Sequence, residues 1–190
     1  MVRNLQGARP VNTRFFRRLV ETLLRERVPN EDFDLGVCII SARAMTRLNE
    51  TFLRHGGSTD VITFDYGDKP GQVGHGTARR KSTAHPADWP DFRSVLEGGI
   101  FICADEAVSQ ARRFRTCWEA ELVRYLVHGI LHLQGYDDSR AGARRRMKKE
   151  EDRLVRRMSR LCDFAELNCR SRAKKRQAIL ARVAGRGKVR

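Results

Sequence analysis

Two histidines four residues apart, His128 and His132, carry the clearest potential for chemistry in this chain. In an α-helix this spacing places both imidazoles on one face, about one turn apart, so that they can bind the same cation. Gly135 follows at a place where helices commonly end, and the returning chain brings Asp137 and Asp138 toward the histidines. The sequence therefore predicts a metal site at the end of a helix.

Asp138 is the predicted third ligand. Ligands at the first, fifth and eleventh positions, with glycine at the eighth, reproduce the spacing of metzincin zinc sites. A carboxylate oxygen is an acceptable zinc ligand, and three protein ligands leave a fourth position for water. We therefore expect one divalent metal ion, with zinc favoured. Asp137 is the alternative: it replaces Asp138 as ligand, orients an imidazole from outside the ligand set, or begins the next helix.

Gly129 separates this pattern from that of a zinc peptidase. It follows the first histidine, where zinc peptidases keep the glutamate that acts as general base. The metal-binding half of such a site is present without its base. A plainer alternative is that His128 and His132 are core histidines of an apolar helix, and the register of Gly135 and Asp138 favours the metal site over it.

The charge of the chain indicates a polyanionic partner. Among 190 residues, 38 Lys and Arg face 23 Asp and Glu, which gives a formal charge of +15, and nucleic acid is the first candidate. No run of about 18 apolar residues exists, so we expect no membrane span. Residues 1–10 lack the apolar core of a secretory signal, and five cysteines without a Cys-x-x-Cys pair fit a reducing cytoplasm.

The length suits one domain with an extension. We expect a single catalytic domain over residues 1–165, with a surface insertion at 66–97 that contains glycine and proline. Residues 166–190 are predicted to form a basic, disordered tail, because there are nine basic and no acidic residues from Arg170 to Arg190 and little to bury.

We expect an α+β fold, in which three or four short strands form one mixed sheet with about five helices and the metal helix is central. The family resemblance given below supports this fold more than the periodic pattern does. Asn12 or Thr13 would cap the first helix, and a capping box from Thr116 to Glu119 would open the metal helix. Phe52 and Leu161 are predicted to face inward from their helices. The expected helices lie at 11–28, 41–53, 105–114, 116–134 and 140–163, and the expected strands at 35–40, 60–64 and 100–103.

A family resemblance covers roughly Leu35 to Leu161. The stretch from His128 to Asp138 reads His-Gly-Ile-Leu-His-Leu-Gln-Gly-Tyr-Asp-Asp, and Arg54 precedes a glycine turn and Ser-Thr-Asp-Val-Ile-Thr-Phe64. These motifs resemble the YbeY family of bacterial ribonucleases, also called rRNA maturation factors. The marks of that family are an Arg-Gly turn, a Ser/Thr-Asp-Val-x-Ser/Thr-Phe strand and His-Gly-x-Leu-His-Leu-x-Gly-Tyr-Asp-His.

Two positions depart from the family pattern. The usual third histidine ligand is replaced by Asp138, which bears on the identity and affinity of the metal. The Gly-Asp-Ile that usually opens the third strand is Gly98-Gly99-Ile100 here, so that the family's aspartate is missing.

The resemblance implies a metal-dependent, single-strand-specific endoribonuclease that acts on the 3′ end of 16S rRNA and in ribosome quality control, with the small ribosomal subunit as partner. Arg54, which matches the family's arginine, would stabilise charge on the phosphate. Two other hypotheses are a zinc peptidase of metzincin-like type and a non-catalytic ribosome-binding factor with a structural metal. The oligomeric state is left open by the sequence.

Basic residues late in the chain are the candidate RNA contacts, since lysine and arginine bind phosphates without sequence preference. They occupy one face of the last helix and the tail: Arg144, Arg145, Lys148, Lys149, Lys174, Lys175 and Arg176.

Overall fold

The computed structural model describes residues 1–27, 34–66 and 98–169. Within these ranges there are four strands, five α-helices and two short turns of other helical types. The elements are, in chain order, β1 (Val2–Asn4), α1 (Thr13–Arg27), β2 (Leu35–Ile40), α2 (Ala42–Leu48), the π-helical turn η1 (Asn49–Leu53), β3 (Val61–Asp65), β4 (Gly98–Cys103), α3 (Ala104–Phe114), α4 (Trp118–Leu133), α5 (Ala141–Leu161) and the 3₁₀ turn η2 (Phe164–Leu167).

The four strands form one mixed sheet in the order β1-β2-β4-β3. Strands β1, β2 and β4 are parallel, and β3 pairs antiparallel with β4 at the edge, with Thr63 opposite Ile100. This confirms the predicted α+β fold. Strand β1 was not predicted, because three residues, two of them polar, carry no periodic signal; it exists through its pairing with β2.

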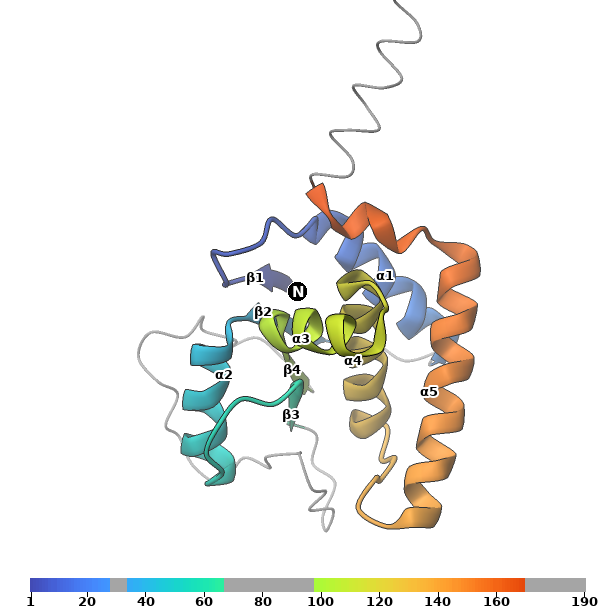
Figure 1. Cartoon of the computed structure of the whole chain (residues 1–190). Helices are drawn as coiled ribbons and strands as arrows, with labels where there is room; N and C mark the ends of the chain where they lie inside the picture. Colours follow the sequence, from blue (N-terminus) through green and yellow to red (C-terminus); the bar gives the residue numbers. More distant parts are fainter. Residues whose placement is uncertain (28–33, 67–97, 170–190) are drawn as a thin grey trace, which may run out of the picture.

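Both faces of the sheet are buried, and they face different helices. Val37 and Ile39 of β2 join a large core with α1, α4 and α5, whereas Cys38 and Ile40 join a smaller core with α2. Alternate side chains of a strand point to opposite faces, so an unbroken apolar strand needs cover on both. Figure 1 shows α2 on one side of the sheet and α1, α4 and α5 on the other.

Helix α4 is the central element, as predicted, and it is buried around most of its circumference. Its predicted capping box is wrong. The helix begins after Cys117 without a side-chain cap, and Thr116 Oγ1 donates to Glu121 Oε1 at 2.6 Å. Glu119 is instead buried and accepts a hydrogen bond from Asn168 Nδ2 at 3.2 Å, so that a tertiary contact replaces the local one.

Several predicted details can be compared directly. Asn12 caps α1, since its Oδ1 accepts from Phe15 N at 3.1 Å. Phe52 and Leu161 were predicted to face inward and are 36% and 58% exposed. Leu161 is the last residue of α5, whereas the ring of Phe52 at the end of η1 packs edge-on against Phe64, with ring centroids 5.1 Å apart, and is covered on one side. The core continues to Leu167, which is fully buried.

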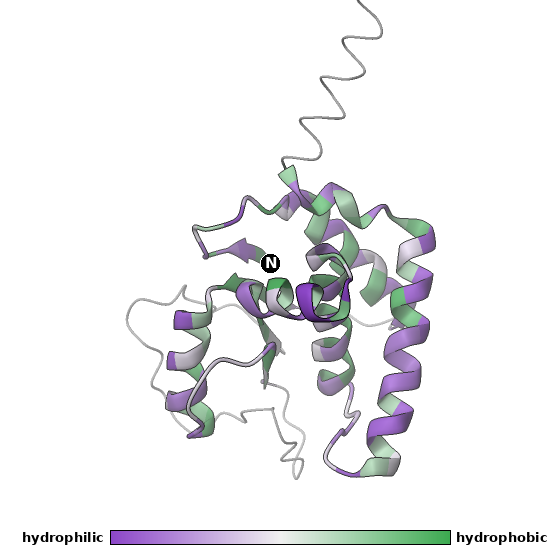
Figure 2. Ribbon diagram, viewed as in Figure 1, coloured by the Kyte–Doolittle hydropathy of each residue, from purple (hydrophilic) through white to green (hydrophobic). Residues whose placement is uncertain are grey.

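The predicted insertion, except for Tyr66, and the tail from residue 170 lie outside the described residues. None of the described helices is long and apolar enough to cross a membrane. Figure 2 shows α5 as mostly hydrophilic along its length, interrupted by the apolar positions that face the core.

Candidate metal centre

The end of α4 is built by a backbone motif that reverses the chain. Gly135 adopts φ 85°, a left-handed conformation that glycine tolerates and most residues avoid. Gly135 N donates to His132 O at 2.9 Å and Tyr136 N to Leu131 O at 3.0 Å. These two bonds are those of a Schellman motif, which satisfies the last carbonyls of the helix. The predicted helix stop is thus confirmed, and the loop that follows carries Asp138 back over the histidines.

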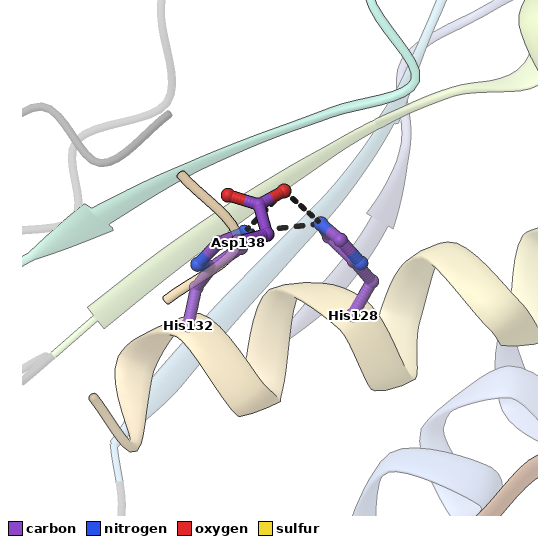
Figure 3. Close-up of side chains that lie close together, drawn as sticks. All are labelled: His128, His132 and Asp138. Atoms are coloured by element: carbon purple, nitrogen blue, oxygen red, sulfur yellow. Dashed lines mark hydrogen bonds and ion pairs between the residues drawn. The ribbon is translucent and has the colours of Figure 1, made fainter. Parts of the chain in front are cut away.

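His128, His132 and Asp138 converge on one point (Figure 3). The two Nε2 atoms are 3.0 Å apart, and Asp138 Oδ2 lies 3.9 Å from each of them. A tetrahedral ion with bonds of about 2.0–2.2 Å separates its ligands by roughly 3.3–3.6 Å. The observed separations bracket that range, so shifts of a few tenths of an ångström would let the three atoms share one ion.

Each imidazole is oriented by a hydrogen bond at Nδ1, the ring nitrogen that faces away from the proposed metal position. His132 Nδ1 lies 3.1 Å from the carbonyl oxygen of Tyr136, which can only accept, so Nδ1 carries the hydrogen. His128 Nδ1 lies 3.0 Å from Glu151 Oε2. When the second nitrogen donates in this way, the lone pair of Nε2 is available to a metal, as is usual for metal-bound histidine.

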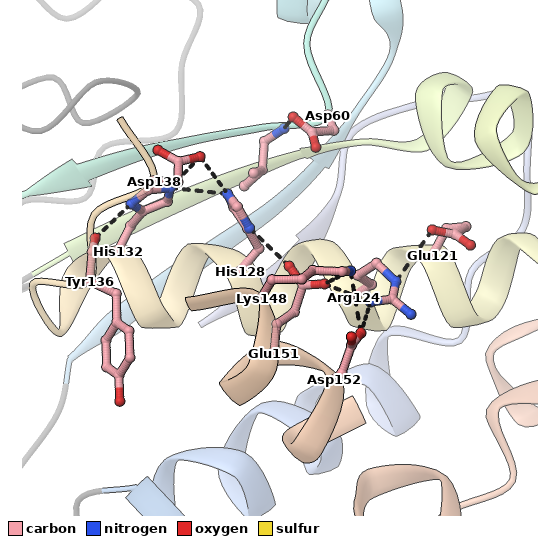
Figure 4. A network of polar contacts seen from close by, with 11 residues as sticks. Asp60, Glu121, Arg124, His128, His132, Tyr136, Asp138, Lys148, Glu151 and Asp152 are labelled. Carbon is pink, nitrogen blue, oxygen red and sulfur yellow. Dashed lines mark hydrogen bonds and ion pairs between the residues drawn. The ribbon is translucent and has the colours of Figure 1, made fainter. Parts of the chain in front are cut away.

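Glu151 is a member of this centre that the sequence did not reveal. It is a charged side chain only 5% exposed, and Figure 4 shows it between α4 and α5 among cationic partners. Arg124 Nη1 and Lys148 Nζ each lie 2.6 Å from its Oε1. A sequence signal for it exists: Glu151 falls in register with the apolar stripe of Met147, Leu154 and Met158, where an acid would be expected to have a buried partner.

The histidines and Glu151 have perturbed pKa values. Burial by itself raises the pKa of Glu151, but hydrogen bonds from His128, Lys148 and Arg124 outweigh it and lower the pKa to about 2. Burial disfavours the charged form of His128, yet the hydrogen bond to Glu151 prevails and raises its pKa. Burial and the charge on His128 both lower the pKa of His132. In the metal-free protein a proton on His128 Nε2 is therefore directed at His132 Nε2.

Gly129 has no room for a side chain. A Cβ there would lie 2.8 Å from Ile100 Cγ2 and 3.2 Å from Thr63 Cγ2, because α4 packs closely on the sheet at this point. A glutamate at this position would collide with β4. The peptidase base is thus excluded from position 129 by packing as well as by sequence.

Asp137 has neither of its expected roles beside the histidines. Its Oδ1 accepts from Ser139 N at 2.9 Å and its Oδ2 from Ser139 Oγ at 2.7 Å. Its carboxylate thus shapes the turn that leads to α5, and these hydrogen bonds lower its pKa. Orientation of the imidazoles, which was one of the alternatives for Asp137, is provided by Glu151 and by the backbone of Tyr136.

The structure describes four of the seven predicted RNA contacts, and two of these four bond to residues of the centre. Arg144 is exposed and its Nε donates to the carbonyl oxygen of Asp138 at 2.8 Å, beside the third ligand. Arg145 and Lys149 are exposed on α5, whereas Lys148 is engaged by Glu151 and, at 3.3 Å, by Asp152. Lys174, Lys175 and Arg176 lie outside the described residues.

Arg54 ends η1 in a left-handed conformation, with φ 57°, and its side chain is exposed. Its backbone N–H donates to Asn49 O, while its guanidinium forms no hydrogen bond or ion pair with another described residue. An exposed guanidinium without a protein partner among these residues is available to an anionic ligand.

The fold and the site together define a class: a small α+β protein whose central helix and following loop bring two histidines and a carboxylate close enough together to hold a metal ion. The family model described as endoribonuclease YbeY matches residues 2–159. This chain therefore belongs to the YbeY endoribonuclease family.

Individual relatives agree with this assignment. The endoribonuclease YbeY of Chlorobium luteolum is 31% identical over 143 residues, which are 75% of this chain and 86% of the relative. The corresponding protein of Geobacter sulfurreducens is 29% identical over 80% of this chain and 90% of its own length. The solution structure of TM1509 from Thermotoga maritima matches with a TM-score of 0.50 and 22% identity, over 83% of this chain and 89% of that one. At this identity the structural match bears on the fold alone.

Proposed function

We propose that this protein is a metal-dependent endoribonuclease that cleaves single-stranded RNA and takes part in maturation of the 3′ end of 16S rRNA and in ribosome quality control. The observation that carries the proposal is the convergence of His128, His132 and Asp138 in a chain of the YbeY endoribonuclease family. We propose one divalent ion at this site, with zinc favoured by the nitrogen and carboxylate ligands.

The chemistry that this site can support follows from its ligands. When bound, a divalent ion polarises a phosphoryl oxygen and lowers the pKa of a bound water. The protein has to hold both Nε2 lone pairs toward the ion, and the hydrogen bonds from each Nδ1 to Glu151 and to the Tyr136 carbonyl do so. The 34% exposure of the Asp138 side chain leaves the ligand side open to an RNA strand.

Basic side chains would hold the RNA. Arg144 bonds directly to the backbone of the loop that carries Asp138, and we assign to it a phosphate next to the scissile one. Arg145, Lys149 and the tail residues would bind flanking phosphates, and Arg54 would stabilise charge on the reacting phosphate. For Lys148, the ion pairs to Glu151 and Asp152 favour a second role within the protein.

The compartment that we propose is the bacterial cytoplasm, where the small ribosomal subunit matures. All five cysteines are free thiols, which suits a reducing environment.

Side-by-side assays on casein and on single-stranded 16S rRNA fragments would test the proposal. We expect RNA cleavage that stops after chelation and returns with added divalent metal, and no casein hydrolysis. RNA binding without cleavage under any metal would instead indicate a ribosome-binding factor with a structural ion.

The basic tail can be tested separately, by measuring RNA affinity against salt concentration. Deleting residues 170–190 should weaken binding and flatten its dependence on salt, by about 0.7 units of logarithmic slope for each phosphate that the tail neutralises on a single strand. An unchanged slope would assign the phosphate contacts to the folded domain.

A further inference from the structure

We infer that Glu151 is a positioning residue of the metal centre, which fixes the orientation of His128 and strengthens it as a ligand through its negative charge. The inference rests on the proposed metal site and concerns a residue outside the ligand set. Its Oε2 is 3.0 Å from His128 Nδ1, and His128 Nε2 is the atom that faces His132 and Asp138.

The two oxygens of Glu151 have separate partners. Oε1 accepts from Arg124 Nη1 and Lys148 Nζ, each at 2.6 Å. Oε2 is directed at the imidazole. The cations hold the carboxylate ionised and in one rotamer within a site that is almost fully buried. A carboxylate that accepts from Nδ1–H makes Nε2 more electron-rich, and therefore a better ligand.

The cations of this network have other partners among the described residues, whereas Nδ1 of the His128 imidazole has Glu151 alone. Arg124 Nη1 also lies 2.7 Å from Asp152 Oδ1, and Arg124 Nε lies 3.7 Å from Glu121 Oε2. Among the residues that the structure describes, Glu151 is the only one bonded to His128 Nδ1. Loss of Glu151 would thus leave the ion pairs of Arg124 partly intact and leave Nδ1 of the half-buried His128 without its acceptor.

Asp152 provides a matched control. It is the next residue of α5 and pairs with the same two cations, Arg124 and Lys148, but its ion pairs within the described part of the chain do not extend to His128. Glu151→Gln and Asp152→Asn each replace a carboxylate with an amide of the same shape and remove one negative charge. They differ in whether the charge that is removed faces the imidazole.

The test measures the affinity of the full-length variants for Zn²⁺ and Co²⁺ by competition with a chromophoric chelator, together with thermal unfolding with and without metal. We expect Glu151→Gln to weaken binding by on the order of 10 to 100-fold and to reduce the increase in Tm that metal produces. Glu151→Ala should weaken it further, because the amide still offers an oxygen to Nδ1–H. Asp152→Asn should bind metal as the parent does.

A purely structural Glu151 would give a different result. Its loss would then lower the Tm of the metal-free and metal-bound forms equally and leave the affinity unchanged, and that outcome overturns the inference. Equal losses of affinity in Glu151→Gln and Asp152→Asn would overturn it too. A parent protein that binds metal but cleaves no RNA would remove the proposed function and leave this inference standing, whereas a parent that binds no metal removes both.

Discussion

The two histidines of the metal centre are held in different ways. His132 is oriented by the carbonyl oxygen of Tyr136, four residues later, in the turn that ends the same helix. His128 is oriented by the carboxylate of Glu151, 23 residues later and on another helix. One ligand is therefore supported by local backbone geometry, and the other by the packing of α5 against α4.

The difference matters because the two supports have different physical properties. A backbone carbonyl is neutral and survives any side-chain substitution, but it depends on the chain reversal at Gly135. A carboxylate adds charge, and it depends on one side chain and on the cations that keep it ionised. Variants of Gly135, which sets the position of the Tyr136 carbonyl, and variants of Glu151 can therefore separate the contribution of local geometry from that of charge.

Removal of either histidine should have the largest effect on metal binding. The loss should be the same for both, whichever group orients the imidazole. His128→Ala and His132→Ala are each expected to abolish metal binding and RNA cleavage, since two remaining ligands hold a divalent ion weakly. Helix α4 should survive, because most of its stability comes from buried leucine and valine side chains. The metal content of the purified variants measures the loss of binding, and circular dichroism measures whether the helix is retained. Full metal content in either variant would place the site elsewhere.

The third ligand should rank next. Asp138→Ala is expected to lower metal affinity more than the loss of an outer contact does, that is, by more than about 100-fold. Asp138→His should keep a metal site, since histidine is the ligand that the YbeY pattern has there. Asp137→Ala serves as the control: its carboxylate bonds to Ser139, so metal affinity should change little. If Asp137→Ala stripped the metal and Asp138→Ala retained it, the assigned register would be wrong by one residue.

Gly135→Ala tests the local support of His132. Alanine in this left-handed conformation costs about 1–2 kcal/mol, and relaxation of the turn would move the Tyr136 carbonyl away from His132. We expect a lower Tm and a metal affinity reduced by up to about tenfold, equivalent to roughly 1.4 kcal/mol.

Gly57→Ala is the matched control for Gly135→Ala. Gly57 also has a left-handed φ, of 92°, and open space around its Cβ position, but it lies in the loop before β3. The Gly57→Ala variant should lose a similar amount of folding stability and keep the metal affinity of the parent protein. Equal losses of affinity in both variants would show that general destabilisation, rather than the Tyr136 carbonyl, is responsible.

The last comparison is a pH dependence that distinguishes the two imidazoles without any substitution. The pKa of His128 is raised, with Glu151, Asp60 and Asp138 all favouring its charged form, while that of His132 is lowered. Below the raised pKa of His128, metal therefore has to displace a proton from that imidazole, whereas the lowered pKa of His132 favours its neutral form. Affinity should increase with pH by up to about tenfold per unit until the raised pKa of His128 is passed.

The contribution of His128 to the stability of the metal-free protein should change in the opposite direction, and comparison with His128→Ala separates it from the contribution of His132, whose lowered pKa gives the reverse trend. A histidine with a raised folded-state pKa stabilises the fold below its unfolded pKa, about 6.5, and that contribution is lost as pH increases through the folded value. Metal titrations and urea unfolding from pH 5.5 to 8.5 measure both trends. In Glu151→Gln the rise in affinity should shift to lower pH, and an unshifted profile would contradict the role of Glu151 in setting the pKa of His128.

The amino-acid sequence by itself determined helix α4, its end and the convergence of three candidate ligands. The spacing of His128 and His132 sets their common face, and Gly135 sets the reversal that returns Asp138. The apolar runs of β2 and β4 likewise predicted buried strands. These features depend on residues within about one or two helical turns of one another, so local rules are sufficient to predict them.

Only the tertiary structure decided what surrounds those ligands. Glu151 contacts His128 because α5 packs on α4. Glu119 forms a hydrogen bond with Asn168 in place of the predicted capping contact. Position 129 has to be glycine because Ile100 of β4 packs closely against the helix there. Asp137 and Asp138 are chemically identical neighbours, and their side chains diverge through the turn at Ser139. Each of these outcomes depends on a partner far away in sequence or on the exact path of a loop, and neither is encoded in a periodic pattern.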